Sequence, residues 1–324
     1  MSKRIDLSII ILNYNSADYL RRCLKSISRS NLGNYAIETI VVDNASTDLS
    51  LKLAQKDKHK WVKYLVLKKN LGFAAGNNQG VKIINPNTKY VLFLNPDTIV
   101  QPKTLKTMID FFNRQPDASA ATCYIKLAKT GQMQPECHRG FPTPWRSFCY
   151  FSGISKLFPK SKFFNGYFLG HLDTSTIHPI EACVGAFLMV KKSVGQNINW
   201  WNESYFFYGE DLDFCYQLYQ KKYKLYFNPH CQITHFQGIS SGIKSQSQKL
   251  SSANRSTKIL AAKSSTEAMK IFYQRNLFSK YNFFTRQLVL GGIKLLEIKR
   301  LFKAKYLWPK SILLLTPGFT APNI

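Results

Sequence analysis

The first 114 residues contain four short apolar runs, each followed by a segment with helical spacing. The runs span residues 7–12, 37–42, 62–67 and 90–94. Near-continuous apolar runs of this length are typical of strands that are covered on both faces. Strands that alternate with helices predict right-handed crossovers and a mostly parallel, doubly wound α/β sheet.

The residues after these runs predict where the helices begin. Ser16 is the expected N-cap of the first helix, and Ser46 or Thr47 that of the second. The third helix is expected to begin at Phe73, and the fourth spans residues 102–114 with proline at its first position. This part of the chain therefore predicts four strand-then-helix units.

Periodicity is weaker in the second half of the chain. Residues 125–180 are rich in Pro, Gly and aromatic residues, and we interpret them as a lid or an acceptor-facing insertion. The pattern then predicts strands at 182–190, 225–227 and 232–235, and a helix that ends at Lys221.

Positive charge is distributed unevenly along the chain. The formal net charge is +27, and residues 241–324 hold 15 Lys/Arg against 2 Asp/Glu, about half of the excess in a quarter of the chain. The Ser- and Lys-rich residues 241–266 predict a linker or mobile loop. We therefore expect one α/β domain over 1–240, with halves at 1–124 and 125–240, and a basic helical tail over 241–324.

The tail predicts a membrane contact. From Phe283 onward, apolar and aromatic residues interleave with Lys and Arg, as in interfacial helices that bind anionic lipid. The alternative is a helix that packs on the catalytic domain and exposes a solvated basic face.

The chain has no features of a secreted or membrane-spanning protein. No apolar run reaches about 18 residues, and the N-terminus lacks the apolar region of a signal peptide. The seven cysteines are scattered and odd in number, which predicts no disulfide framework. We expect a cytoplasmic protein that binds peripherally to the inner face of the cell membrane.

Polar side chains follow all four apolar runs. In doubly wound sheets, ligands bind outside the carboxyl ends of the strands. We therefore expect one shared crevice, and its candidate residues are Asn13, Asn15, Asp43, Asn44, Asn70, Asn95 and Asp97.

Two interpretations are open for each of two crevice candidates, Asp97 and Asp43, and for His235. Asp97 suits Mg²⁺ or Mn²⁺, which prefer oxygen ligands, or it is the capping acid of a proline turn. Asp43 accepts hydrogen bonds from a base or ribose, or it builds an Asx turn. His235, at the end of a predicted strand, is a metal ligand or a structural histidine.

A cluster of three acids, Glu210, Asp211 and Asp213, follows four consecutive aromatic residues, 205–208. At the lip of an apolar pocket, desolvation would raise a carboxyl pKa toward the range of a general base. The alternative is an acidic first turn that complements a helix dipole.

Seven motifs, in their order along residues 7–240, resemble those of inverting family 2 glycosyltransferases with the GT-A fold. Within that family the pattern is most similar to the rhamnosyltransferase-like branch. The motifs are SIIILNYNS, IVVDNASTD, KNLGFAAGNNQG, LFLNPDT, ACVGAFLMVKK, FFYGEDLDFCYQL and THFQGIS.

The resemblance implies roles for individual residues. Asp97 would bind Mg²⁺ or Mn²⁺ and His235 would complete that site, while Asp211 would be the general base, with Glu210 as the second choice. The family's usual D-x-D motif reads Asn95-Pro96-Asp97 here, so one acid is missing. The residues expected to bind the nucleotide and the donor sugar are Asn13, Asn15, Asp43, Asn44, Asn70, Gly72, Asn77 and Asn95.

The implied reaction is transfer of a sugar, with rhamnose one candidate, from a dTDP- or UDP-linked donor to a saccharide or lipid-linked acceptor in surface polysaccharide synthesis. One alternative is a non-catalytic regulator that binds a nucleotide sugar. Another is a nucleic-acid-binding protein, which the acids expected in the crevice disfavour because they repel phosphate. We therefore expect no nucleic-acid partner.

Overall fold

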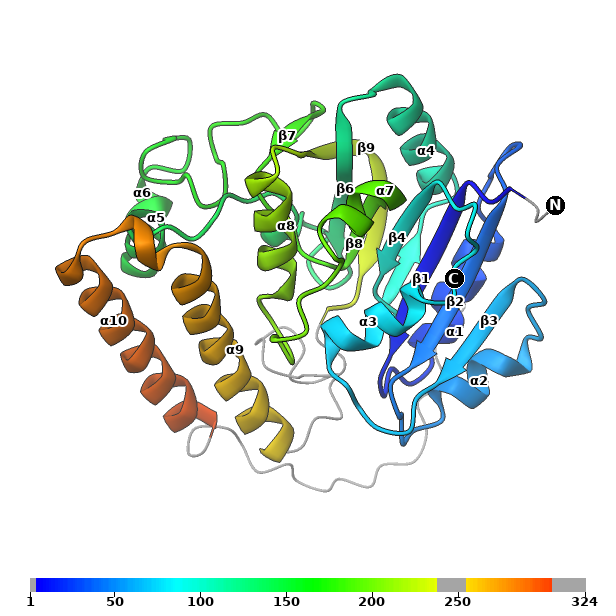
Figure 1. The fold of residues 1–324 in the computed structure, drawn as a ribbon, viewed down its shortest axis with the longest axis horizontal. Coiled ribbons are helices and arrows are strands. Elements are labelled where there is room, and N and C mark those ends of the chain that lie inside the picture. Colours follow the sequence, from blue (N-terminus) through cyan, green and yellow to red (C-terminus); the bar gives the residue numbers. More distant parts are fainter. Residues whose placement is uncertain (1–3, 238–254, 305–324) are drawn as a thin grey trace.

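The computed structural model describes residues 4–237 and 255–304. Its centre is a nine-stranded sheet in the order β3-β2-β1-β4-β8-β6-β9-β5, with β7 paired to β9 (Figure 1). The strands are β1 Leu7–Asn13, β2 Ile37–Asp43, β3 Val62–Val66, β4 Tyr90–Leu94, β5 Thr98–Val100, β6 Ala118–Leu127, β7 His178–Ile180, β8 Phe187–Lys191 and β9 Lys224–His235.

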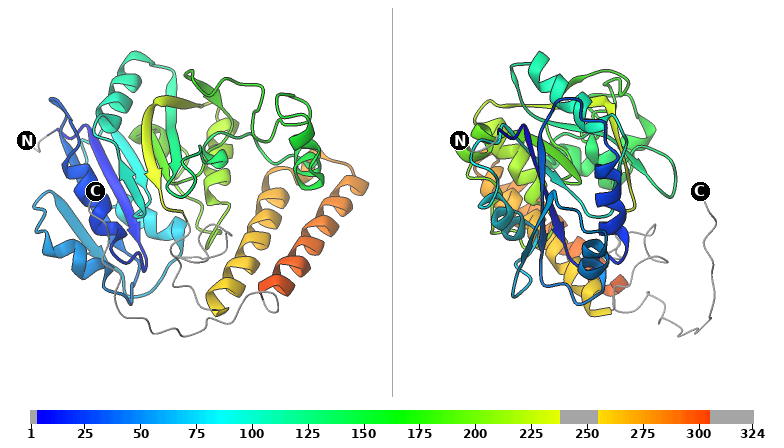
Figure 2. Two further views of the ribbon diagram at one scale, coloured as in Figure 1. Left: turned by 180° about the vertical axis from the view of Figure 1, so that it is seen from behind. Right: turned by 90° about the vertical axis from the view of Figure 1, so that its right-hand side faces the viewer.

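The half of the sheet built from β1, β2, β3 and β4 is parallel, as predicted. Helices α1, Tyr19–Ser28, and α3, Phe73–Val81, cover its opposite faces (Figure 2). In the other half, β8 runs antiparallel to both β4 and β6, while β5 and β7 run antiparallel to β9. The α/β class is confirmed, and the sheet as a whole is mixed.

The helices follow the strands in the predicted order. Their bounds are α1 Tyr19–Ser28, α2 Ser50–Lys56, α3 Phe73–Val81, α4 Thr104–Arg114, α5 Pro144–Ser152, α6 Ile154–Leu157, α7 Lys192–Asn197, α8 Glu210–Gln220, α9 Arg255–Asn276 and α10 Phe283–Phe302, with short 3₁₀ turns at Pro135–Cys137 and Phe278–Lys280.

The predicted caps of the first two helices are wrong. Helix α1 begins at Tyr19, because the Ser16 hydroxyl donates to Asn13 Oδ1 at the end of β1. Helix α2 begins at Ser50, because Ser46 Oγ accepts hydrogen bonds from the β1 loop instead of capping a helix. Both serines bond to residues at or just after the end of β1, and neither caps a helix.

Two strand predictions and part of the linker prediction also change. The strand expected at 182–190 is limited to Phe187–Lys191. The two short strands expected at 225–227 and 232–235 form one strand, β9, which tolerates a register shift against β6. The expected linker 241–266 is helical from Arg255, while the boundary at residue 240 lies outside the described residues.

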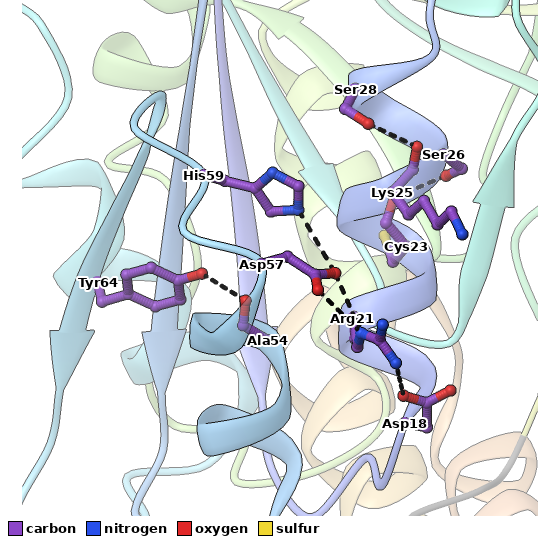
Figure 3. Close-up of polar contacts among 10 residues, drawn as sticks. All are labelled: Asp18, Arg21, Cys23, Lys25, Ser26, Ser28, Ala54, Asp57, His59 and Tyr64. Carbon is purple, nitrogen blue, oxygen red and sulfur yellow. Dashed lines mark hydrogen bonds and ion pairs between the residues drawn. The ribbon is translucent and has the colours of Figure 1, made fainter.

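An exposed polar cluster joins α1 to the end of α2 (Figure 3). Arg21 Nε lies 3.0 Å from Asp57 Oδ2, and Asp57 also lies 4.0 Å from His59 Nε2. The Arg21 side chain is 43% exposed, so its ion pair contributes at most about 1 kcal/mol. This ion pair therefore contributes little to the stability of the protein.

Helices α9 and α10 form an antiparallel hairpin at the end of the molecule remote from β3 (Figure 1). Helix α9 joins the main core through Ala268, Phe272 and Tyr273. Tyr216 Oη on α8 also donates to the Asn276 carbonyl at 2.9 Å. Within the described residues, no helix combines the length and apolarity needed to cross a membrane.

Candidate active site

A buried hydrogen-bond network joins the ends of β1 and β2. Asn13 and Asp43 are partners in the parallel register, and Asn13 Nδ2 donates to Asp43 Oδ1 at 2.7 Å. Asp43 Oδ2 accepts from the backbone N–H of Ser46 at 3.1 Å. Asp43 therefore makes the predicted turn contact, while its neighbour Asn13 orients the carboxylate. Nucleotide binding by Asp43 stays a prediction.

Asn15 and Asn44 fix the loops beside that network. Asn15 has a left-handed backbone with φ of 48°, and its Oδ1 accepts from the Thr47 N–H at 2.8 Å. Asn44 Nδ2 donates to Asn70 Oδ1 at 2.8 Å, so the loop after β2 is tied to the loop after β3. These asparagines lie at the same edge of the sheet as Asp43.

Gly72 brings the two halves of the protein together. Its φ is 83°, and an added Cβ would lie 2.5 Å from the Phe206 carbonyl oxygen. That oxygen accepts from the Phe73 N–H at 2.9 Å. The start of α3 therefore touches the loop that leads into α8. Asn77 is buried, and its Nδ2 donates to the Phe73 carbonyl within the same helix.

Strand pairing brings Asp97 and His235 together. Thr98 of β5 is the register partner of His235, and His235 Nε2 lies 3.2 Å from Asp97 Oδ1. Asn95 Nδ2 is 3.5 Å from the same nitrogen. The second ring nitrogen, Nδ1, lies 2.7 Å from Gln134 Oε1. Gln134 is the orienting group that a metal-binding histidine requires.

This arrangement fits a divalent cation. With Gln134 Oε1 as acceptor, the neutral His235 ring carries its proton on Nδ1, so the Nε2 lone pair faces the Asp97 carboxylate. Two acceptors this close repel each other unless a proton or a cation lies beside both. Among the described residues no three His, Cys, Asp or Glu side chains gather, so diphosphate oxygens and water would have to complete the shell.

The N-terminus of α8 holds a buried ion pair. Arg139 Nη2 lies 2.9 Å from Asp211 Oδ2, and the two side chains are 8% and 14% exposed. Burial lowers the pKa of Arg139, but the charge of Asp211 and smaller effects of other nearby groups together outweigh it, so the net pKa is raised. Asp211 Oδ1 accepts from the Leu212 N–H at 2.7 Å.

The other two acids of this cluster have different environments. Burial, followed by the charge of Asp211, raises the pKa of Glu210 to about 8. Its buried Oε2 has no hydrogen-bond partner among the described residues. Asp213 is fully buried and accepts from Tyr205 Oη and Asn276 Nδ2, so it anchors α8 to α9.

The aromatic residues before α8 line a hollow, but the acids are not at its lip. A cavity of about 380 Å³ lies between this loop and helices α9 and α10. Glu210 and Asp211 are absent from its lining, so an apolar pocket around them stays a prediction. The lining consists of Ser204, Tyr205, Phe206, Phe207, Tyr208, Lys263, Ser264, Glu267, Ala268, Ile271 and Glu297.

Arg139 and Gln134 were missed in the sequence because they lie in the irregular stretch 125–180. Periodicity carries no signal there. Their positions depend on long-range contacts, such as the backbone pairing of Arg139 with Ala182.

The family model described as Glycosyl transferase family 2 matches residues 8–173, about half of the chain. The chain belongs to glycosyl transferase family 2. The match covers the network at β1 and β2, the Asp97 turn, and both Gln134 and Arg139. Asp211 and His235 lie beyond its end.

Three curated relatives are similar over larger spans. The hexosyltransferase Agl10 of low-salt glycan biosynthesis in Haloferax volcanii is 28% identical over 65% of this chain and 61% of that protein. Rhamnosyltransferase WbbL of Escherichia coli is 26% identical over 70% and 82%. The N-acetylglucosaminyl-diphospho-decaprenol L-rhamnosyltransferase of Mycobacterium tuberculosis is 23% identical over 79% and 84%. This chain thus spans less than two thirds of Agl10.

Solved structures support the fold. GalNAc-T7, solved with UDP, GalNAc and Mn²⁺, superposes with a TM-score of 0.56 over 94% of this chain and 59% of that chain, at 15% identity. The fold is therefore that of the GT-A glycosyltransferases, as the sequence motifs implied.

Proposed function

We propose that this chain transfers a sugar from a nucleotide diphosphate donor to a saccharide or lipid-linked acceptor, with inversion at the anomeric carbon. The observation that carries the proposal is the buried Arg139–Asp211 pair at the start of α8. It places a carboxylate of fixed orientation beside the loop that touches Gly72. A hydroxyl bound there would lose its proton to Asp211 as the new C–O bond forms.

Asp211 is the better candidate base of the two neighbouring acids. Glu210 has a pKa of about 8 and therefore carries a proton at pH 7, and a neutral carboxylic acid is too weak a base to take another. Asp211 pairs with Arg139 through one oxygen, which fixes the direction of the carboxylate. Asp43 and Asn44 are proposed to hold the nucleotide, with Asn15 and Asn70 fixing the loops around it.

Asp97 and His235 are the residues proposed to hold Mg²⁺ or Mn²⁺, with Gln134 orienting His235. Such an ion, when bound, supplies positive charge next to the leaving diphosphate. The dTDP- and UDP-linked sugars are the donors to test. Rhamnose comes first, because two relatives above are named rhamnosyltransferases.

We also propose that the protein works on a membrane surface as a cytoplasmic peripheral protein. The outward face of α10 carries Phe284, Leu288 and Leu295, which are 77%, 77% and 70% exposed. Lys294 and Lys299 flank them in the exposed part of the helix. Truncation before α9 is an unsuitable test, because α9 belongs to the core.

The deciding experiment is a panel of dTDP- and UDP-linked sugars, scored for turnover with and without Mn²⁺ or Mg²⁺. The proposal expects turnover of one donor class that Asp211→Asn abolishes. A nucleotide-sugar-binding regulator is the alternative. It would bind a donor without turning it over, and Asp211→Asn would leave its biological role unchanged.

A further inference from the structure

A second exposed apolar surface lies on the segment that contains α5 and α6. Six large side chains within 19 residues are between 42% and 74% exposed. Exposed apolar residues at this density mark an interaction site, whereas single ones do not. We call this set the aromatic surface, and it consists of Trp145, Phe148, Phe151, Leu157, Phe158 and Phe163.

The segment that carries the aromatic surface has charges of one sign. No acidic residue occurs between Glu136 and Asp173, while Lys156, Lys160 and Lys162 are all exposed. Aromatic rings combined with lysines on long flexible stems are typical of surfaces that insert at the boundary of an anionic bilayer. Each near-surface lysine strengthens such binding through the negative lipid potential.

A hollow within this surface suits a lipid phosphate. It measures about 370 Å³ and is lined by Thr143, Trp145, Arg146, Lys162 and Phe163. Arg146 is held in place by two hydrogen bonds to Glu181, at 2.6 and 2.9 Å. Glu181 balances much of the Arg146 charge, and Lys162 adds a second positive charge to the hollow. An aromatic wall beside these groups fits a head group that has one apolar side and one anionic side.

The aromatic surface and α10 lie at the same end of the molecule. Figures 1 and 2 both show α5 and α6 beside the start of α10, at the end remote from β3. On α10, the exposed residues Leu288, Leu295 and Phe302 are seven residues apart and share one face. The two surfaces can therefore meet one plane.

We propose that the aromatic surface is a second membrane contact, which acts together with the outward face of α10 to hold the protein on an anionic bilayer. Two separated contacts fix the orientation of the protein, which one helix cannot do. A second copy of this chain is a poorer occupant. In a two-fold dimer the patch faces itself, so Lys156, Lys160 and Lys162 would oppose like charges.

The test is co-sedimentation of the full chain with vesicles of phosphatidylcholine, alone or with phosphatidylglycerol, at low salt. The wild type is expected to bind only the vesicles that contain phosphatidylglycerol. Replacement of Lys156, Lys160 and Lys162 by glutamine should weaken that binding at least about tenfold. The matched control is glutamine at three exposed lysines near α2, namely Lys52, Lys56 and Lys60.

A second variant tests the apolar part. Serine at Phe148, Phe151 and Phe163 should weaken binding at least as much, whereas serine at the exposed Leu49 and Val66 should not. Far-UV circular dichroism verifies that each variant is folded. Binding that is equal in the surface and control variants would overturn the proposal, as would an aromatic-surface-dependent dimer without vesicle binding. Neither result would affect the proposed transferase activity, because vesicle binding needs no donor or acceptor.

Discussion

The two halves of the sheet bring polar side chains to the same edge by different means. In the parallel half, each polar residue directly follows its strand, and the register alone sets Asn13 beside Asp43. In the mixed half, the side chains come from a loop and a helix start, and distant contacts such as Arg139–Asp211 hold them. The first arrangement depends on strand pairing and the second on a buried charge pair.

The largest expected effect comes from Asp211, the proposed catalytic carboxylate of the mixed half. Asp211→Asn should lower kcat by about 10² to 10⁴-fold, because a general base contributes that much. The measurement is turnover of the donor found in the panel described above. Asp173→Asn, an exposed acid in the same half, is the matched control. An Asp211→Asn enzyme with kcat close to that of the control would remove Asp211 from the mechanism.

The buried and the exposed ion pair should differ strongly in stability. Arg139→Met should lower the free energy of unfolding by about 3–5 kcal/mol, because it leaves the Asp211 charge without its partner. Arg21→Met, in the exposed cluster of Figure 3, should cost less than about 1 kcal/mol. Urea denaturation measures both. Equal losses of unfolding free energy in the two variants would contradict the claim that a buried charge pair stabilises the mixed half.

The raised pKa of Glu210 predicts a pH dependence of stability. Between its ordinary value near 4.5 and about 8, the unfolded chain releases this proton while the folded protein keeps it. Stability therefore falls as pH rises through this range, by up to a few kcal/mol, and is level above about 8. Glu210→Gln should remove that decline.

Thermal or urea unfolding of the wild type and Glu210→Gln at pH 5 and pH 8.5 checks this expectation. The variant should gain stability relative to the wild type at the higher pH. A difference between the two proteins that is the same at both pH values would show that Glu210 titrates alike in the folded and unfolded states.

The smallest expected effect concerns the residue that orients His235. Gln134→Ala should weaken Mn²⁺ binding by about 10 to 100-fold, as is usual when the partner of a ligating histidine is lost. Isothermal titration with Mn²⁺ in the presence of a nucleoside diphosphate measures it. Gln132→Ala, an exposed glutamine two residues away, should bind like the wild type. An unchanged affinity in Gln134→Ala would argue against His235 as a ligand.

The difference between the parallel and the mixed half also explains which features could be predicted from the sequence. Strands β1 to β4 and the polar residues after them were predicted because apolar runs and parallel register are local signals. The Asp97–His235 contact needed the pairing of β5 with β9, and β5 is only three residues long. The predicted caps at Ser16 and Ser46 were wrong because the Ser16 hydroxyl bonds back to Asn13 at the end of β1, while Ser46 Oγ accepts from Asn15 in the neighbouring loop.

The second half was less predictable for a physical reason. The positions of Gln134 and Arg139 depend on the packing of an irregular segment. Arg139 bonds to Ala182 and Asp211, 43 and 72 positions away, and Gln134 bonds to His235, 101 positions away. The different roles of the two tail helices were also not predictable from the sequence. Its apolar residues are split between a core-facing helix, α9, and an outward face on α10, and periodicity does not distinguish these two roles.

Binding of the donor most directly tests whether both halves serve one ligand. Isothermal titration of the nucleotide sugar with Mn²⁺ should show weaker binding by Asp43→Asn and Asp97→Asn, and near wild-type binding by Asp211→Asn without turnover. Removal of Mn²⁺ should erase the difference between Asp97→Asn and the wild type. Unchanged donor affinity in both Asp43→Asn and Asp97→Asn would show that these strand ends do not share a nucleotide site.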